Sequence, residues 1–314
     1  MTGILTFCVR KTLCISIFFG LSLLISSFAA ALPSDPSSQA ADALMAEYQK
    51  HETGLSKSPL ILPIHLESMV DSSSAVGSIY GIIDHPFEII KKELLVPSIW
   101  CDIVLLHTNI RACTYANIDR NWLLTLYNVT VFYQPLSEAD RLAFSYRVIS
   151  STAAYIEIVM TAVNGPFNTH DHSFRLRAAP LNGNRTFMHV SYSYHYNSVA
   201  YLAMKSYFAL IASGRTGFTI TGRDEKNNPV YVSGVKGAIE RNVMRYYLAF
   251  MAYFDSLSSP EEQRYEKRIN AWYDLSARYK RQFPEIRKEE YLEYKRADLK
   301  TQLLLQANYP VKVK

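Results

Sequence analysis

The sequence has few of the features that assign a protein to a common functional class. It has only 4 cysteines, and its 33 Lys and Arg residues are interleaved with 28 Asp and Glu residues. Such a mild and mixed charge does not indicate a nucleic-acid-binding surface. The sequence contains no Gly-x-Ser-x-Gly elbow, His-Glu-x-x-His helix, P-loop or dinucleotide fingerprint. We therefore expect no nucleic-acid partner and no cofactor.

The first 31 residues have the pattern of a secretory signal peptide. Arg10 and Lys11 precede an uncharged run over residues 12–31, which ends in three alanines. Cleavage after about Ala31 would export the protein, to the periplasm if the source is bacterial. An uncleaved membrane anchor is the alternative, because the run is nearly long enough to span a bilayer. No second run of 18 or more apolar residues occurs, so we expect no further membrane span.

Two cysteines remain beyond the leader, Cys101 and Cys113. A pair in an oxidising compartment favours a disulfide. Two buried thiols are an equally acceptable reading. A metal site would need more ligands than this pair supplies.

Composition and the pattern of apolar residues divide the chain into four parts. These are the signal peptide, a Ser-, Ala- and Pro-rich linker over 32–58, a folded domain over 59–257, and a helical C-terminal extension over 258–314. Alternation of apolar residues near 62–66 and an apolar run over 75–83 predict the first strands. Two short helices are expected over 86–93 and 97–106. Further strands are expected near 109–116, 122–134, 142–150, 153–164, 172–180 and 186–197. Their short connections require antiparallel pairing.

Helical periodicity replaces alternation after residue 197. The pattern of apolar residues over 200–212 is typical of a helix, and the pattern over 214–237 is mixed between helix and strand. Apolar residues then recur at three- and four-residue steps from Val235 to Phe254, which predicts one long amphipathic helix. Ser259 and Pro260 begin another helix, and residues 285–305 predict a charged one.

This order of elements resembles the helix-grip fold of the START-like (SRPBCC) superfamily, in which a curved antiparallel sheet wraps around a long C-terminal helix. The resemblance covers about residues 60–257 and implies an α+β domain, here with extra C-terminal helices. The Gly-rich loop of the pollen-allergen branch has no counterpart, and residues 200–234 are an insertion. The stretches Trp100–His107 (WCDIVLLH) and Glu240–Tyr247 (ERNVMRYY) look like ones in uncharacterised exported bacterial proteins. The superfamily implies an internal cavity for a lipid or another hydrophobic molecule, and some of its members are enzymes.

Tyrosines are the first candidate ligand contacts. In a strand over 186–197, Tyr192, Tyr194 and Tyr196 share one face by strict alternation. Rings that carry hydroxyl groups suit a cavity wall, and Tyr127 and Tyr146 could contribute from other strands. The alternative is that these rings only pack against the long helix.

Three arginines are candidates for a polar head group. Arg241 and Arg245 lie four residues apart, so a helix places them on one face, where they could bind a carboxylate or phosphate. Ordinary ion pairing is the alternative. Arg111, with Asp102 and His107, could form an acid, base and clamp, or a structural hydrogen-bond network.

A histidine-rich segment raises the question of a metal. On a strand, His170 and His172 would point the same way, next to His189 and His195. The segment also reads as a polar loop, and we expect no metal there.

We expect an exported protein that binds or carries a lipid or other hydrophobic small molecule, with transient membrane contact. One alternative is an exported hydrolase, cyclase or isomerase that uses Asp102, His107 or Glu240 as its acid or base. Another is an interaction protein that docks an unknown partner through its C-terminal helices.

Overall fold

The computed structural model describes residues 35–210, 214–283 and 286–309. The predicted signal peptide lies outside the described residues. Within these ranges, no helix combines the length and the hydrophobicity needed to cross a membrane.

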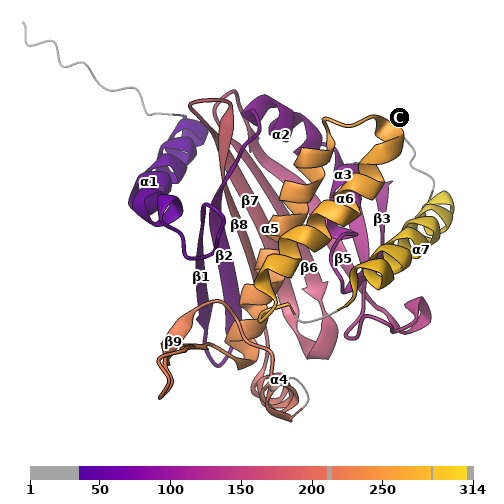
Figure 1. Ribbon diagram of the computed structural model, residues 1–314. Coiled ribbons are helices and arrows are strands. Elements are labelled where there is room, and N and C mark those ends of the chain that lie inside the picture. Colours follow the sequence, from indigo (N-terminus) through magenta and orange to yellow (C-terminus); the bar gives the residue numbers. More distant parts are fainter. Residues whose placement is uncertain (1–34, 211–213, 284–285, 310–314) are drawn as a thin grey trace, which may run out of the picture. The chain divides into compact units, whose positions relative to one another are not determined.

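An eight-stranded antiparallel sheet is the centre of the fold (Figure 1). Its spatial order is β1-β2-β8-β7-β6-β5-β4-β3. The strands are β1 (Ile64–Val70), β2 (Ser74–Ile83), β3 (Ile110–Ile118), β4 (Asn121–Asn128), β5 (Asp140–Ser151), β6 (Ile156–Asn164), β7 (His170–Leu181) and β8 (Arg185–His195). All seven pairings are antiparallel, as the short connections predicted.

Seven α-helices and a small hairpin complete the described chain. The helices are α1 (Pro36–Ser56), α2 (Phe87–Leu94), α3 (Pro97–Val104), α4 (Ser198–Leu210), α5 (Gly234–Ser256), α6 (Glu261–Ser276) and α7 (Lys288–Ala307), and the hairpin is β9 (Ile220–Arg223) with β10 (Pro229–Tyr231). Short 3-10 turns occupy Leu136–Glu138, Pro166–Asn168 and Ala277–Tyr279.

The sheet grips α5 on its inner face (Figure 1). The stripe predicted from Val235 to Phe254 is buried, and so are other faces of the same helix. Two glycines of β2 permit the close approach. A Cβ on Gly81 would overlap the ring of Tyr247, and one on Gly77 would lie 3.0 Å from Ile239. The α+β helix-grip class expected from the sequence is confirmed.

Trp100 is the centre of the packed interior beneath α3. Its ring meets those of Tyr146, Phe174 and Phe250 edge-on, at centroid distances of 5.6–6.1 Å. The indole N–H donates to the carbonyl oxygen of Leu94 at 2.8 Å, so the buried polar group is satisfied. A disulfide between Cys101 and Cys113 joins α3 to β3.

The segment expected to be a linker, with a short helix around residues 40–50, is helical over most of its length. α1 begins at Pro36 after an Asp35 N-cap and runs for 21 residues on the outer face of the sheet. Leu44 and Leu55 are buried there, in a second apolar cluster that includes Tyr80, Tyr155 and Phe187. Met45, Tyr48 and two alanines pack against the same cluster. The sequence obscured this because small side chains make up much of the packed face of a Ser- and Ala-rich helix.

The charged C-terminal helix is also packed into the fold, and it caps the exposed edge of the sheet. Gln302 accepts the backbone N–H of Cys113 at 2.8 Å. Gln306 accepts the N–H of Tyr115 at 2.8 Å and donates to its carbonyl at 2.9 Å. Side-chain amides thus satisfy backbone groups of edge strand β3 that would otherwise offer a template for another strand.

Candidate functional site

A cavity lies between the inner face of the sheet and α5, with a volume of about 180 Å³. Its apolar lining includes Ile110, Leu126, Leu142, Phe144, Met204 and Phe208. Its hydrogen-bonding lining consists of Asn128, Thr169, His172, Asn242 and the tyrosines Tyr192, Tyr194, Tyr207 and Tyr246. Mostly apolar walls with a few polar groups are the usual composition of a small-molecule site.

Helix α4 covers one side of this cavity. Met204 and Phe208 are one helical turn apart, so they face the cavity together, and Tyr207 lies beside them. The ring of Tyr207 meets that of Phe167, from the turn before β7, at a centroid distance of 5.9 Å. The inserted segment recognised in the sequence therefore supplies a lid.

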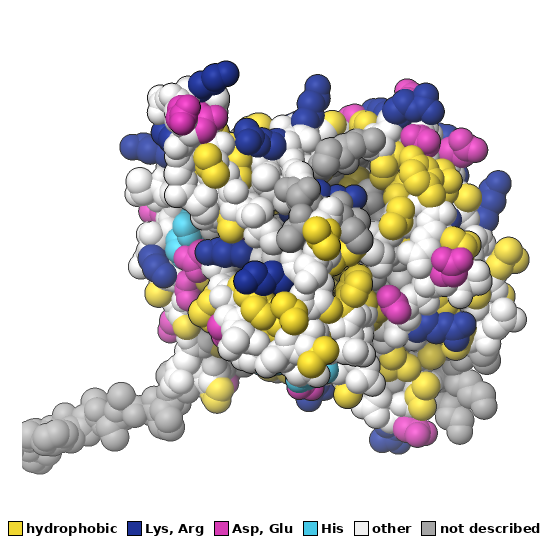
Figure 2. Space-filling view, turned by 90° about the horizontal axis from the view of Figure 1, so that it is seen from below, with side chains coloured by type: hydrophobic (Ala, Val, Ile, Leu, Met, Phe, Trp, Pro, Cys, Tyr) yellow, Lys and Arg dark blue, Asp and Glu magenta, His cyan; other side chains and the backbone are white. Residues whose placement is uncertain are grey.

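The outward side of α4 also carries large apolar side chains. Val199, Leu202 and Leu210 are 76%, 64% and 81% exposed. Figure 2 shows hydrophobic side chains gathered on the face that carries α4 and the β9–β10 hairpin. Lys205 and Ser206 are exposed on the same helix, so its outward side combines large apolar side chains with polar ones.

A chain of hydrogen bonds runs along the cavity wall and joins four of its lining residues. The Thr169 hydroxyl donates to the Pro166 carbonyl at 2.6 Å, so its oxygen accepts from His172 Nε2–H at 3.0 Å. His172 Nδ1 is then left to accept the hydroxyl proton of Tyr192, at 2.6 Å. This order of donors assigns the proton of the neutral imidazole to Nε2.

Both members of the His172–Tyr192 pair are held neutral. Burial lowers the pKa of His172 to about 4 and raises the pKa of Tyr192 far above its ordinary value. At pH 7 the pair has a fixed donor direction and no charge. Such a pair orients a ligand but is a poor acid–base catalyst, because neither pKa lies near the working pH.

The pKa of His172 predicts acid sensitivity. In the unfolded chain an imidazole titrates near pH 6.5, whereas in the folded chain burial lowers the pKa to about 4. The unfolded state therefore binds more protons between these values, and the free energy of unfolding falls as the pH falls through this window. The full loss from this residue is about 3 kcal/mol.

Urea denaturation at pH 7 and at pH 4.5 measures this loss. His172→Gln should show a smaller drop than the wild type, and His170→Gln, at a half-exposed histidine, should not. Equal drops in the wild type and in His172→Gln would contradict the assignment.

Asn242 of α5 is the other fixed polar group of the wall. His107 Nδ1 accepts the backbone N–H of Asn109 at 3.0 Å, so its Nε2–H donates to Asn242 Oδ1 at 3.1 Å. Burial lowers the pKa of His107 well below its ordinary value, so this bond also joins neutral groups. Its effect is to fix the direction of the Asn242 amide at the cavity.

The predicted tyrosines divide into two groups. Tyr192 and Tyr194 line the cavity, whereas Tyr127, Tyr146 and Tyr196 do not. The Tyr196 hydroxyl donates to the carbonyls of the β1–β2 turn, and the Tyr146 hydroxyl donates to that of Leu94 at 2.8 Å. Tyr127 lies on the other face of β4, beneath the guanidinium of Arg141.

The predicted arginines also lie away from this cavity. Arg111 pairs with Asp298 at 2.8 Å, and Arg241 donates to the Thr216 carbonyl at 3.0 Å. Arg245 places its guanidinium over the ring of Phe283 at 4.6 Å. The contact of Arg111 is an ion pair, whereas those of Arg241 and Arg245 are a hydrogen bond to a backbone carbonyl and a cation–π contact.

Arg245 does line a second cavity, which has a volume of about 590 Å³. This cavity lies outside the sheet–helix grip, between α6 and the loops that flank β3 and β4, and Arg215 and Lys280 also reach it. It lacks the fixed hydroxyl and imidazole chain of the inner cavity.

The residues of the enzyme hypothesis do not converge. Asp102 pairs with Arg268 at 3.1 Å, His107 is held by Asn242, and Arg111 faces α7. The carboxylate of Glu240 accepts the backbone N–H groups of Phe218 and Thr219 and the hydroxyls of Ser68 and Thr219, at 2.6–2.9 Å. None of these four residues lines the inner cavity.

The sequence placed His170 and His172 on one face, and this was wrong. The β7–β8 register shifts between His170 and Ser173, and Asp171 adopts a left-handed conformation with φ of 51°. His172 therefore turns into the core, while His170 pairs with Asp171 at the surface and stacks on His195. His189 lies on the outer face and accepts from Arg177.

Sequence reasoning missed several residues that line the cavity. His172 was considered only as a metal ligand, and Asn242 and the lid residues Met204 and Phe208 were not singled out. The available signal for His172 was its position two residues before Phe174 on an alternating strand. The lid gave no such signal, because its helix carries apolar side chains on both sides.

Comparisons with known proteins found similarity among solved structures alone. No family model and no curated protein matches the chain. Among solved structures, norcoclaurine synthase from Thalictrum flavum is similar at 10% identity and a TM-score of 0.33, covering 44% of this chain and 86% of that one. Human StAR-related lipid transfer protein 5 is similar at 10% identity and a TM-score of 0.27, covering 51% and 82%. The Zhui aromatase/cyclase from Streptomyces sp. R1128 is similar at 9% identity and a TM-score of 0.30, covering 68% and 96%.

The fold is a helix grip. The architecture that the resemblance implied is present in the chain's own antiparallel sheet and in α5. At such identities the assignment rests on the order and pairing of the chain's own strands around α5. Function has to be argued from the site.

Proposed function

We propose that this protein is an exported binding protein for a compact hydrophobic molecule that carries one polar group. The observation that carries the proposal is the inner cavity, whose lining combines apolar side chains with hydrogen-bonding groups of fixed direction. An apolar cavity of about 150 Å³ in another protein is large enough to bind benzene. The volume of about 180 Å³ here suits one ring or a short alkyl chain.

The polar groups determine how such a molecule would lie. The Tyr192 hydroxyl donates its proton to His172, so its oxygen is left to accept a hydrogen bond from the ligand. The Asn242 Oδ1 already accepts from His107, which orients the amide. A ligand hydroxyl is matched by these groups, whereas a charged carboxylate would meet no cation among the described residues that line the cavity.

Entry would require α4 to move, because its side chains line the cavity. The exposed apolar side chains of α4 would then contact a membrane surface, from which a hydrophobic ligand or an acyl chain could be exchanged. Cosedimentation with phosphatidylcholine vesicles tests this contact. Equal recovery of the wild type and Leu202→Ser with the vesicles would contradict it.

A titration with 4-ethylphenol tests the cavity itself. We expect saturable shifts of the methyl NMR signals of Leu126, Leu142 and Met204, while the outer-face signals of Leu44 stay unchanged. Leu142→Trp should fill the cavity and weaken binding at least about tenfold, because little room remains for the ring. Val148→Trp, at an exposed position of the same strand, is the control. Unsaturable shifts, or equal binding by Leu142→Trp, would contradict the proposal.

A further inference from the structure

A second cluster of chemically active side chains lies on the outer face of the sheet, remote from the inner cavity. His51 belongs to α1, and His65 and Glu67 belong to β1. Residues two apart on a strand share a face, so His65 and Glu67 both point towards α1. Leu66, which lies between them in the alternation, packs against the inner core.

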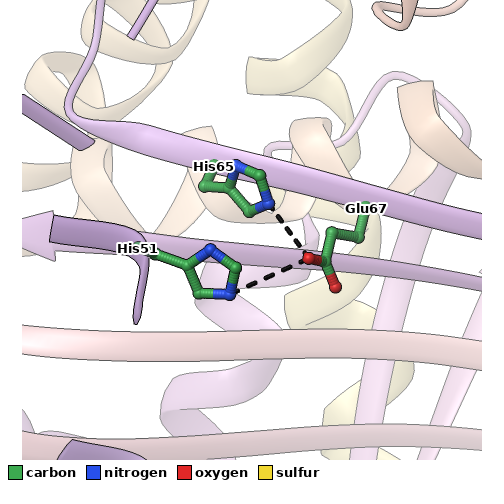
Figure 3. Close-up of side chains that lie close together, drawn as sticks. All are labelled: His51, His65 and Glu67. Carbon is green, nitrogen blue, oxygen red and sulfur yellow. Dashed lines mark hydrogen bonds and ion pairs between the residues drawn. The ribbon is translucent and has the colours of Figure 1, made fainter. Parts of the chain in front are cut away.

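The three side chains converge on one point (Figure 3). Glu67 Oε1 lies 3.0 Å from His65 Nε2 and 3.8 Å from His51 Nε2. The two imidazole rings stack at a centroid distance of 4.2 Å. One donor atom from each residue lies within 4.8 Å of the donor atoms of the other two.

We propose that His51, His65 and Glu67 bind a divalent transition-metal ion, with zinc as the best match. Zinc bonds to imidazole nitrogen and carboxylate oxygen are about 2.0–2.2 Å long in tetrahedral sites, which separates neighbouring donors by roughly 3.3 Å. The separations of 3.0 and 3.8 Å bracket this value. Two imidazoles and a carboxylate prefer zinc to calcium or magnesium, which take all-oxygen sites.

His51 supplies an independent observation. Only 6% of the surface of His51 is exposed. Among the described residues, no hydrogen-bond partner meets its Nε2 atom. A buried polar atom without a partner is costly, and a metal ion at the convergence point would satisfy it.

The surroundings suit a cation. Glu47 Oε2 lies 3.6 Å from His51 Nε2, which adds a second carboxylate beside the proposed ligands. Tyr80 packs against the far side of the His51 ring, at 4.6 Å, and holds it in place.

The proposed ion would fasten α1 to the edge of the sheet. α1 is otherwise held by the apolar cluster around Leu44 and Leu55, so the metal would add a second attachment near its C-terminal end. Binding to the folded state alone raises stability by mass action. Glu67 is partly exposed, which leaves a path by which the ion can enter.

Calorimetric titration of the purified, metal-stripped full chain with ZnCl₂ tests the site. We expect one ion per chain, no binding of CaCl₂, and a higher melting temperature with zinc. His65→Ala and Glu67→Gln should each weaken binding at least about tenfold. His170→Ala removes a surface histidine that also lies beside a carboxylate, and it should leave zinc affinity unchanged.

X-ray absorption at the zinc edge gives a readout that does not depend on stability. Two imidazole ligands are expected in the wild type and one in His65→Ala. The absence of saturable zinc binding, or unchanged affinity in both His65→Ala and Glu67→Gln, would overturn the proposal. A zinc site that is lost only in His170→Ala would overturn it as well.

Discussion

Lys295→Ala is expected to lower the free energy of unfolding by about 3–5 kcal/mol. The ammonium group is fully buried and donates to the carbonyls of His107 and Ile110, at 2.9 and 2.7 Å, and to Asp298 at 3.0 Å. Burial lowers the pKa of Lys295, while the Asp298 carboxylate opposes the shift. Without the ammonium, two carbonyls lose a buried donor, and Asp298 is left with Arg111.

Denaturation with urea measures the loss. Lys300→Ala is the matched control, because it removes the same side chain from an exposed position of the same helix. We expect that control to lie within about 0.5 kcal/mol of the wild type. A loss below about 1 kcal/mol in Lys295→Ala would show that α7 is not part of the cooperative fold.

Glu240→Ala is the second change with a large expected effect, a loss of about 2–4 kcal/mol. The carboxylate is completely buried and accepts from two backbone N–H groups and two hydroxyls. Without it, the N–H groups of Phe218 and Thr219 lose their acceptor. The segment that joins the lid helix α4 to the β9–β10 hairpin would then loosen.

Glu240→Gln separates hydrogen bonding from charge. Its amide oxygen can still accept the two backbone N–H groups, and the two hydroxyls can rotate to accept from the amide nitrogen. We therefore expect Gln to retain most of the stability that Ala loses, and Glu225→Ala, at an exposed position, to lose little. Hydrogen exchange at Phe218 and Thr219 should accelerate in Glu240→Ala. Unchanged exchange there would contradict the role of Glu240.

The order of elements could be predicted because the buried faces of the central strands and of α5 are apolar and periodic. α7 was harder to interpret, because its buried residues include Lys295, Asp298 and Gln302, and the pattern therefore reads as a solvated helix. The interaction-protein hypothesis assigned the C-terminal helices to a partner. In the structure, α7 covers the edge strand and its adjoining loop, and the partner hypothesis stays a prediction.

The candidate site could be predicted only in part, for two physical reasons. Alternation along β8 placed Tyr192 and Tyr194 on the inner face, since an uninterrupted strand keeps its period. The irregularity at Asp171 takes His170 out of the alternation that His172 shares with Phe174, so the two histidines do not share the face that the sequence assigned to them. The His51–His65–Glu67 cluster joins a helix to a strand, and contacts of that kind leave no periodic signal.

Native mass spectrometry of the purified full chain, followed by solvent extraction, tests the central claim most directly. The account predicts a bound apolar molecule of low mass that carries a hydroxyl-type polar group, and it predicts that Leu142→Trp is recovered without this molecule. A wild-type chain that is recovered empty, and that takes up none of a panel of compact phenols, alcohols and lipids, would contradict the account.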